Sequence, residues 1–523
     1  MPIYAAAHIC VPDVNKIGHE FVPHCRCRHL FSAAEHCLGF LYRIILSRTI
    51  GSEGLGVYQA AYTVFAVFLT ISASGLPVTL SRVISRHRAH ANRHREQSAV
   101  TGAVLITLCI SVPVTVVLFL FRNQFSAVFA DPRCADLFYI LLAGLACTSV
   151  YSVIRGSFWG NKRFFAYSFI ELVEEMIRIG VGIALILFVA TDIYGANLAA
   201  VAVLISYLCS FAIALVYFFM TGGKFRSPRG ELKPLISSAL PVTAMRTSSS
   251  LLSSLISVLF PLQLQAAGYT AARAMSEYGV VYGMVMPVMA IPCAFIGSIA
   301  LVLVPELSEN FYRGNQKQVQ ALTQRALKAS LLVSCALIPF YLVCGEDIGV
   351  MLYSNAASGK MLSACALLLL PMSLTMISSS LLNSLGCEKH TLGIFLAGSA
   401  AMLACTFFLP RYLAGGALLV GMASDTLITA LLSLLLLRKK TGGLHIGTHL
   451  AKLFAALAPV TAAAYFIHRL LMVYLSYFPA LAITMILLAA GEAAMLSLLR
   501  LIDLKSLFAR FFGKKRKKIT SRS

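Results

Sequence analysis

The chain has 523 residues, of which 59% are hydrophobic and only 12% are charged, and its mean hydropathy is +0.81. A soluble core cannot bury that much apolar surface, so the composition excludes a soluble globular protein and indicates an integral membrane protein. A formal net charge of +22 would suggest a nucleic-acid partner in a soluble protein, but in a membrane protein the positions of the charges decide.

The basic residues follow a membrane topology. Most of the 43 Lys and Arg residues fall in every second loop and in the C-terminal tail, and few fall in the loops between. The rich segments are 82–95, 155–163, 224–233, 313–328, 389, 438–452 and 505–522. Because cytoplasmic loops carry this excess, we predict a multi-pass protein of the cytoplasmic membrane with both termini in the cytoplasm. Its partners would be membrane lipids and not nucleic acid.

Apolar stretches long enough to cross a bilayer recur from near residue 30 to residue 500. A helical crossing needs about 20 mostly apolar residues, and about fourteen such stretches are present. The predicted spans lie near 30–50, 57–81, 99–121, 137–157, 168–190, 195–220, 235–263, 279–304, 326–344, 361–385, 392–409, 414–437, 451–471 and 478–500. The predicted fold class is an all-α polytopic membrane protein.

Turn residues and charge divide this series of spans. The segment 222–234 combines Gly, Pro, Lys and Arg, a composition typical of a linker. The predicted parts are a polar N-terminal segment (1–29), an N-lobe of six spans (30–221), a cytoplasmic linker (222–234), a C-lobe of six spans (235–440), two further spans (441–504) and a basic cytoplasmic tail (505–523).

Landmark residues recur between the two predicted lobes at nearly equal spacing. They are Pro77, Pro113 and Gly160 in the first lobe, and Pro305, Pro339 and Gly386 in the second. Each lobe has an even number of spans, so both would insert with the same orientation. This predicts a parallel repeat and a carrier that handles its substrate between two lobes.

The sequence contains no motif of an enzyme. It lacks a P-loop, a dinucleotide-binding fingerprint, HExxH and GxSxG. We therefore predict no enzyme, no metal site and no cofactor, apart from a possible coupling H⁺ or Na⁺. What remains is a set of charges within predicted spans, where charge is costly unless it faces water, a cavity or a partner. They are Arg43, Arg48, Glu171, Glu174, Glu175, Arg178, Arg246, Asp425 and Glu492.

Arg43 and Arg246 lie in the first span of each predicted lobe, and Arg48 follows Arg43 in the same span. A guanidinium stays charged and binds phosphate oxygens bidentately, so cavity-facing arginines suit the phosphate or pyrophosphate of a head group. The alternative is that each arginine pairs with a glutamate and locks the helix bundle. Because charge at membrane depth is functional by default, we favour the cavity.

The carboxylates in the spans suggest different roles. Glu174 and Arg178 stand four residues apart on one helical face, so we interpret them as a structural ion pair. Asp425 and Glu492 are isolated carboxylates, and either could bind a coupling proton or cation.

Several short motifs, taken in order, resemble one known family. They are Gly39 to Gly51 with Glu53-Gly54-Leu55-Gly56-Val57-Tyr58-Gln59, Gly75-Leu76-Pro77, Glu174 with Arg178, Leu240-Pro241-Val242-Thr243, Leu303-Val304-Pro305-Glu306-Leu307-Ser308-Glu309, and Asn383-Ser384-Leu385-Gly386 with Lys389. This order is similar to that of the stage V sporulation protein B group. That group belongs to the polysaccharide-export and flippase (MOP) superfamily, which also holds peptidoglycan lipid-precursor flippases and the MATE multidrug antiporters.

The resemblance covers about residues 37–500 and implies a fourteen-helix, two-lobe carrier that moves lipid-linked sugars across the cytoplasmic membrane. In the lipid-precursor flippases the first helix and the seventh or eighth supply cavity arginines, which correspond to Arg43 and Arg246. Relatives usually carry Ser-Arg and an apolar run before the Leu-Gly-Phe of the first span, whereas Glu35-His36-Cys37 stands there in this chain. We therefore expect the first span, and the start of the chain, to differ from those of relatives.

The predicted function is a flippase that moves a lipid-linked oligosaccharide precursor by alternating access. The expected substrate is a peptidoglycan lipid intermediate used in sporulation or cell-wall synthesis, with cell-wall synthesis enzymes as expected partners. Two alternatives stay open. One is a cation-coupled multidrug exporter of the MATE type, in which Asp425 or Glu492 carries the ion. The other is a membrane scaffold that recruits partners through its basic loops and tail.

Overall fold

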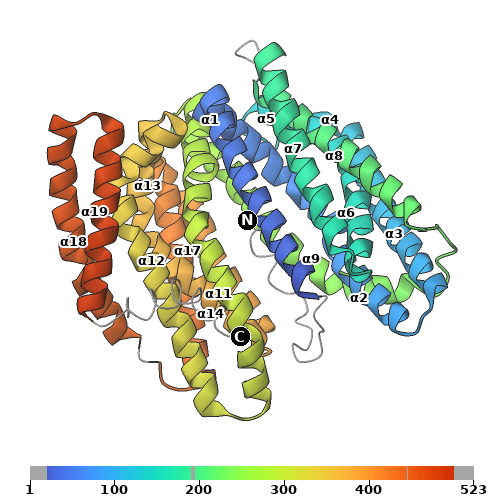
Figure 1. Cartoon of the computed structure of the whole chain (residues 1–523). Coiled ribbons are helices and arrows are strands. Elements are labelled where there is room, and N and C mark those ends of the chain that lie inside the picture. Colours follow the sequence, from blue (N-terminus) through green and yellow to red (C-terminus); the bar gives the residue numbers. More distant parts are fainter. Residues whose placement is uncertain (1–20, 190–194, 445, 500–523) are drawn as a thin grey trace, which may run out of the picture. The chain divides into compact units, whose positions relative to one another are not determined.

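A computed structural model describes residues 21–189, 195–444 and 446–499. Within these ranges every regular element is a helix (Figure 1), which confirms the predicted all-α class. By its internal contacts the chain forms two compact units. Over the described residues, unit 1 is made of 21–287 and 402–421, and unit 2 of 288–401 and 422–499.

Unit 1 holds the first half of the chain and one later segment. Its helices are α1 (Phe21–Ala73), α2 (Leu76–Ala89), α3 (Arg93–Leu120), α4 (Arg122–Ser126), α5 (Pro132–Leu142), α6 (Leu145–Gly160), α7 (Phe164–Val189), α8 (Gly195–Met220), α9 (Leu232–Ala266), α10 (Ala271–Tyr278), the π-helix η3 (Gly279–Val285) and α16 (Pro410–Leu413).

Unit 2 holds most of the second half of the chain. Its helices are most of α11 (Met286–Tyr312), α12 (Gln316–Tyr353), α13 (Ala356–Cys365), the 3₁₀ turn η4 (Ala366–Leu368), α14 (Leu369–Ser384), most of α15 (Glu388–Phe408), most of α17 (Gly416–Thr441), α18 (Gly447–Tyr474) and α19 (Tyr477–Leu498).

Side-chain caps explain where several helices begin. Asn92 precedes α3 and accepts a hydrogen bond from the backbone N–H of Arg95 at 3.2 Å. Asp131 precedes α5 and accepts one from the backbone N–H of Arg133 at 2.9 Å. Asn315 precedes α12 and caps it in the same way. The first N–H groups of a helix have no partner within the helix, so these polar side chains fix the starting residues.

Helix α1 bends sharply at Gly51, whose φ of 69° and ψ of −176° are not helical. Glycine has no Cβ and adopts this positive φ without the steric cost that other residues meet. Before the bend, α1 runs in the same direction as α7. Gly39 faces Glu175, and a Cβ at Gly182 would lie 2.7 Å from the hydroxyl of Tyr42, so later residues of α1 meet later residues of α7.

After the bend, α1 returns along α8. Ile50 contacts the first residue of α8, and further on the hydroxyl of Tyr62 lies 3.5 Å from that of Tyr207 within α8. Helices α7 and α8 are antiparallel, because Arg163 just before α7 donates to the carbonyl of Thr221 just after α8 at 3.4 Å. The two halves of α1 therefore form a helical hairpin, drawn in blue in Figure 1.

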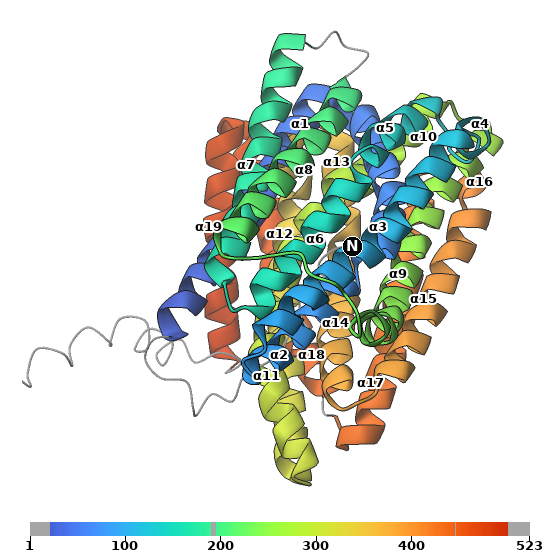
Figure 2. The ribbon, with the colours of Figure 1, turned by 90° about the vertical axis from the view of Figure 1, so that its right-hand side faces the viewer.

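The core of unit 1 lies between α2, α3, α6, α8 and the start of α9, the side of the unit that Figure 2 turns toward the viewer. Fully buried side chains include Leu80, Ile84, Ala99, Ile154 and Leu235. The core of unit 2 lies between α11, α12, α14, α17, α18 and α19. In each unit the apolar core fixes the helices on which the charged residues stand.

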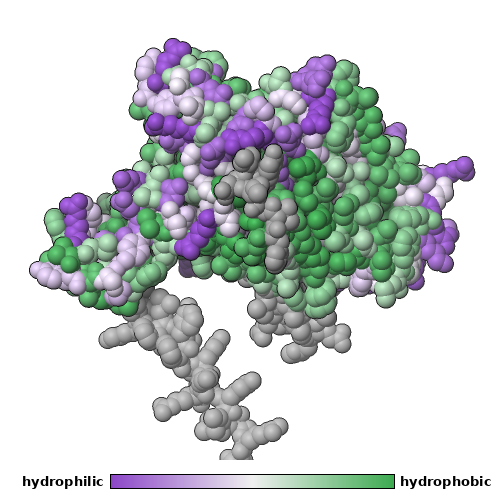
Figure 3. Space-filling view, turned by 90° about the horizontal axis from the view of Figure 1, so that it is seen from above, coloured by the Kyte–Doolittle hydropathy of each residue, from purple (hydrophilic) through white to green (hydrophobic). Residues whose placement is uncertain are grey.

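Eleven described helices are long and apolar enough to cross a bilayer, and twelve if the bent pair α5 and α6 makes one crossing. Large hydrophobic side chains also cover much of the surface (Figure 3), as expected of helices that face lipid. The chain is thus a multi-pass membrane protein. The predicted count of about fourteen spans is not confirmed, because α1 carries two predicted spans on one bent helix and α7 carries four charged side chains.

The structure can be compared with the predicted linker and with the predicted proline landmarks. The predicted linker 222–234 lies inside unit 1, so the contact-defined units are not the predicted lobes, and the lobe division stays a prediction. Pro77 starts α2, where its missing N–H costs nothing, whereas Pro305 lies inside α11 instead of ending a span. Membrane helices tolerate such an interior proline when neighbouring groups satisfy the freed carbonyl.

Candidate functional site

Arg43 lies on the first half of α1, about two turns before the bend at Gly51. Its Nη1 atom donates a hydrogen bond to the backbone carbonyl of Tyr282 at 3.5 Å, within the π-helix η3. It forms no ion pair with a carboxylate of the described residues. A guanidinium has several N–H donors, so Arg43 keeps most of them for another partner. Single π-helical segments are often found at functional sites.

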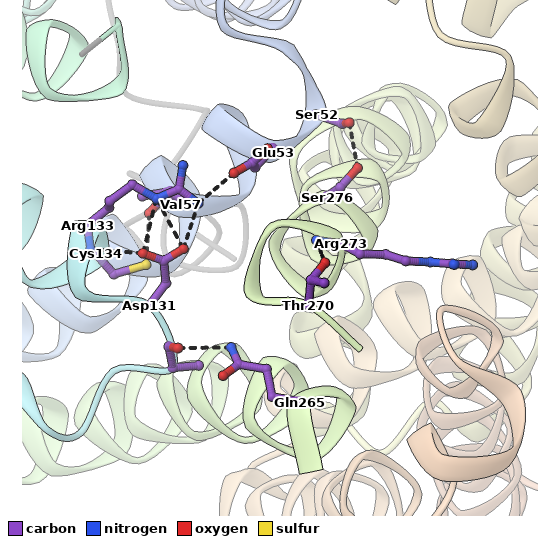
Figure 4. A network of polar contacts seen from close by, with 11 residues as sticks. Ser52, Glu53, Val57, Asp131, Arg133, Cys134, Gln265, Thr270, Arg273 and Ser276 are labelled. Carbon is purple, nitrogen blue, oxygen red and sulfur yellow. Dashed lines mark hydrogen bonds and ion pairs between the residues drawn. The ribbon is translucent and has the colours of Figure 1, made fainter. Parts of the chain in front are cut away.

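Helix α1 crosses α10 and η3 so closely that glycine is needed on both sides. A Cβ at Gly56 would overlap the carbonyl of Met275, and a Cβ at Gly279 would overlap the carbonyl of Ser52. The hydroxyls of Ser52 and Ser276 lie 2.7 Å apart at the same crossing (Figure 4). This contact fixes where Arg43 stands relative to η3.

A polar network next to the bend joins α1 to α5 and to the end of α9 (Figure 4). The Nη2 atom of Arg133 lies 2.7 Å from Asp131 Oδ2 and 2.5 Å from Glu53 Oε1. The side chain of Gln265, at the end of α9, donates to the carbonyl of Ala130 at 2.9 Å. Asp131 is buried, while Arg133 and Glu53 are partly exposed. The network therefore holds the bend at a solvent-accessible edge.

Arg246 lies on α9 and contacts the other end of α1. Its Nη1 atom donates to the carbonyl of Ser74 at 3.0 Å, at the break between α1 and α2. A Cβ at Gly75 would overlap the side chain of Thr243, so α9 packs directly against this break. One turn away the hydroxyls of Thr70 and Ser250 lie 3.1 Å apart. The arginine therefore satisfies a carbonyl that the end of α1 leaves open.

The structure places the predicted arginines in one unit but at different depths. Arg43 precedes the bend by about two turns, and Ser74, which Arg246 contacts, follows it by about six. Because the halves of α1 are antiparallel, the two guanidiniums differ in depth by roughly four turns, or about 20 Å. Arg48 lies between Arg43 and the bend and is exposed. The three arginines do not form one cluster.

The charges on α7 behave differently, because they pair with each other. Arg178 lies 2.9 Å from Glu174 and 2.8 Å from Glu175, and these side chains are largely buried. Arg155 on α6 lies 2.8 Å from Glu171. The contact between Glu174 and Arg178 is the one that their spacing predicts; its structural role stays a prediction. The sequence analysis did not find Glu175 as a second partner, nor the pair of Arg155 with Glu171.

The isolated carboxylates Asp425 and Glu492 both lie in unit 2. On α17, Asp425 packs against α15 so closely that a Cβ at Gly398 would overlap its Oδ1 atom. On α19, Glu492 is 4% exposed. Among the described residues, Asp425 Oδ1 and Glu492 Oε1 have no hydrogen-bond partner. Both therefore keep an acceptor that a proton or cation can use, and their coupling role stays a prediction.

Unit 2 also contains an apolar cavity of about 510 Å³ between α12 and α18. Its lining includes Ile338, Leu342, Phe454, Leu457 and Phe466. A cavity of this kind accepts a hydrocarbon chain without loss of hydrogen bonds. The sequence analysis missed this cavity. Apolar residues on two helices that are far apart in the sequence do not indicate whether a gap remains between the packed helices.

Comparison with known proteins identifies the family. Residues 30–311 match a family model described as polysaccharide biosynthesis protein. This match covers more than half of the chain and includes Arg43, the α7 charges and Arg246. The chain belongs to this family.

Individual relatives of the family are distant. The chain is 24% identical to stage V sporulation protein B of Bacillus subtilis (strain 168) over 63% of the chain and 66% of that protein. The match therefore spans slightly less than two thirds of this relative's length.

Two solved structures show the family's fold. A structure of the lipid II flippase MurJ in an inward closed conformation matches with a TM-score of 0.68 and 14% identity, covering 92% of this chain and 99% of that one. An inward-facing MATE transporter of the MOP superfamily matches with a TM-score of 0.64 and 17% identity, covering 78% and 96%. At such identities the likeness shows the fold alone. These two neighbours are themselves described as a transporter and a flippase.

Proposed function

We propose that this protein is a flippase that moves a lipid-linked glycan precursor across the cytoplasmic membrane by alternating access. The observation that carries the proposal is the set of contacts of Arg43, which lies in an apolar part of α1. Its guanidinium donates a hydrogen bond to a carbonyl of η3 and forms no ion pair with a carboxylate of the described residues. A cation without a counter-charge at membrane depth suits an anionic substrate. The phosphate or pyrophosphate that joins a glycan to its lipid is such a group.

The depths of the arginines suggest an order of contacts. Arg246 acts nearer to the predicted cytoplasmic linker, and Arg43 and Arg48 nearer to the bend of α1. In the proposed sequence the head group meets Arg246 first and the two α1 arginines later. An inside-negative membrane potential favours this outward movement of an anion by about 2.3 kcal/mol per charge per 100 mV.

The apolar cavity of unit 2 is proposed to hold a hydrocarbon chain of a lipid. Its volume of about 510 Å³ and its aliphatic and aromatic lining suit a hydrocarbon segment and offer little to a sugar.

The finer identity of the substrate is proposed from the relatives. One relative is a stage V sporulation protein, and one structural neighbour is a lipid II flippase. We therefore propose a peptidoglycan lipid intermediate used in sporulation or cell-wall synthesis. Enzymes of cell-wall synthesis are the proposed partners, and both termini are proposed to lie in the cytoplasm.

Cation-coupled export is a second candidate function. It is favoured by the buried oxygens of Asp425 and Glu492 that have no hydrogen-bond partner among the described residues. If these carboxylates bind H⁺ or Na⁺, efflux of a cationic compound should depend on that ion. The same carboxylates could also couple an ion to the proposed lipid substrate.

The test is transport in proteoliposomes that contain a fluorescent lipid-linked peptidoglycan precursor. We expect wild type to move the precursor between leaflets and Arg43→Ala to lose this movement. Arg411→Ala is the matched control, because it removes one exposed arginine of α16 far from α1 in sequence. No movement by wild type, combined with ion-dependent dye efflux that Asp425→Asn abolishes, would replace the flippase with the exporter.

A further inference from the structure

Unit 1 contains a second basic feature, which the transport proposal does not use. It is a cavity of about 360 Å³ where the α2–α3 turn, the α6–α7 turn and the end of α8 meet. Three arginines, Arg88, Arg93 and Arg163, stand around it. Arg88 and Arg93 flank the α2–α3 turn, whereas Arg163 belongs to the α6–α7 turn, so the sequence does not indicate that all three share one site.

Backbone carbonyls hold each of these arginines in place. Arg88 donates to the carbonyl of Asn161 at 2.6 Å. Arg93 and Arg163 donate to carbonyls just after α8, each at 3.4 Å. None of the three forms an ion pair with a carboxylate of the described residues. Each guanidinium uses one donor to fix its position, which leaves other donors for a ligand in the cavity.

The rest of the wall determines the kind of ligand. Glu96 is the one carboxylate residue among the residues that line the cavity, so three guanidiniums outweigh one acid. Gln97 is held by the carbonyl of Gly222 at 3.1 Å and by Arg226 at 2.8 Å. Phe158 and Phe218 are buried and form an apolar inner surface. A positive rim above an apolar surface suits an anion attached to a less polar group.

We propose that this cavity binds a phosphate-bearing group, from either the head group of an anionic lipid or a soluble phosphate ester. Guanidiniums bind phosphate oxygens bidentately, and three of them around one cavity can share a single phosphate. The site lies at the end of unit 1 that carries its basic turns. The proposal is independent of the flippase proposal, because it involves none of the arginines on α1 or α9.

The simpler alternative is that these charges only set membrane topology. The chain supplies a matched control for it. Arg82 and Arg86 on α2 and Arg95 on α3 are exposed and do not line the cavity. Topology and general attraction to an anionic surface should depend on both sets alike, whereas a specific site should depend on the cavity set alone.

The experiment compares wild type with two triple variants of the full chain. One is Arg88→Gln/Arg93→Gln/Arg163→Gln, and the other is Arg82→Gln/Arg86→Gln/Arg95→Gln. Each is titrated in detergent with phosphatidylglycerol, and bound lipid is measured by native mass spectrometry. We expect the cavity variant to bind at least about tenfold more weakly than wild type and the control variant to bind within about twofold, since only the cavity variant loses charged hydrogen-bond donors to the phosphate.

A second titration separates the two sources of phosphate. If glycerol 3-phosphate stabilises wild type against heat and displaces bound lipid, while the cavity variant does not respond, the ligand class is a soluble ester. If it does neither and the lipid binding remains specific, the ligand is a lipid head group. Equal losses in both triple variants, or no loss in either, would overturn the proposal.

A smaller pair of variants covers the case in which the cavity variant does not fold. Arg93→Gln and Arg95→Gln remove exposed charges two residues apart on α3, and only Arg93 lines the cavity. We expect Arg93→Gln to weaken lipid binding about three- to tenfold and Arg95→Gln to leave it unchanged. Identical binding by these two variants would contradict a site in the cavity.

Discussion

Two sets of arginines in the membrane helices of unit 1 are held in opposite ways. Arg43 on α1 and Arg246 on α9 donate to backbone carbonyls. Arg155 on α6 and Arg178 on α7 form ion pairs with glutamates of α7. A carbonyl orients a guanidinium but does not neutralise it, whereas a carboxylate does both. Arginines of similar sequence context can therefore have different functions, and the partner decides which.

The largest effect on stability should come from removing the arginine of a buried cluster of ion pairs. Arg178→Met leaves Glu174 and Glu175 buried without a counter-charge. Removing one partner of a buried ion pair costs about 3–5 kcal/mol, so we expect a loss of this size in the free energy of unfolding. Unfolding by SDS titration in mixed micelles measures it. The variant Glu174→Gln/Glu175→Gln/Arg178→Met should regain most of the loss, because it leaves no charge unpaired.

Near-normal stability of Arg178→Met would contradict a structural role of the ion pairs of Arg178 with Glu174 and Glu175. If that variant instead lost transport while it kept its unfolding free energy, Arg178 would belong with the arginines that are proposed to bind substrate. The triple variant then would not restore transport. A change in unfolding free energy would therefore indicate a structural role of Arg178, and a change in transport alone would indicate a role in substrate binding.

Arg43→Ala should show the reverse pattern. Its guanidinium has no carboxylate partner among the described residues, so we expect the free energy of unfolding to change by less than about 1 kcal/mol. Loss of charged hydrogen bonds to a phosphate, at about 2–3 kcal/mol, should slow movement of the lipid-linked precursor roughly 30- to 160-fold. Arg43→Lys keeps the charge without the bidentate geometry and should fall between the two. A transport rate for Arg43→Ala equal to that of Arg411→Ala would contradict the proposed role.

Arg246→Gln should have a smaller and mixed effect. The side chain satisfies the carbonyl of Ser74 at the end of α1, so its loss should cost about 1 kcal/mol of stability. If the head group passes Arg246 before it reaches Arg43, transport should slow by about tenfold. Measuring both quantities in one preparation separates the two contributions. A stability loss with unchanged transport would give Arg246 the structural role that is predicted for Arg178.

The sequence carried enough information to predict the local parts of this comparison. Glu174 and Arg178 are four residues apart, and helical periodicity alone brings them together. Arg43 stands out because the residues next to it in the same predicted helix are apolar. These inferences need only the residues of one helix, and for the same reason the all-α class was predictable from the apolar spans.

Tertiary features could not be predicted in the same way. The acceptor of Arg43 is a backbone carbonyl of η3, and every residue has a carbonyl, so no residue type marks it. The pair of Arg155 with Glu171 joins two helices whose contact the sequence does not specify. The difference in depth between Arg43 and Arg246 depends on the bend at Gly51, which turns two predicted spans into one helical hairpin.

The smallest effect should come from the network at the bend of α1. Arg133 forms ion pairs like those of Arg178, but its side chain is 48% exposed, and that of its partner Glu53 is 39% exposed. Water already solvates such a pair, so Glu53→Gln, which leaves Arg133 paired with the buried Asp131, should cost only about 1 kcal/mol or less. A double-mutant cycle with Arg133→Gln, measured by SDS titration, isolates the exposed pair from the loss of the contact with Asp131. A coupling energy as large as that expected at Arg178 would show that the bend buries this network in some functional state. In that case the ion pair between Glu53 and Arg133 would hold α1 to α5 during transport.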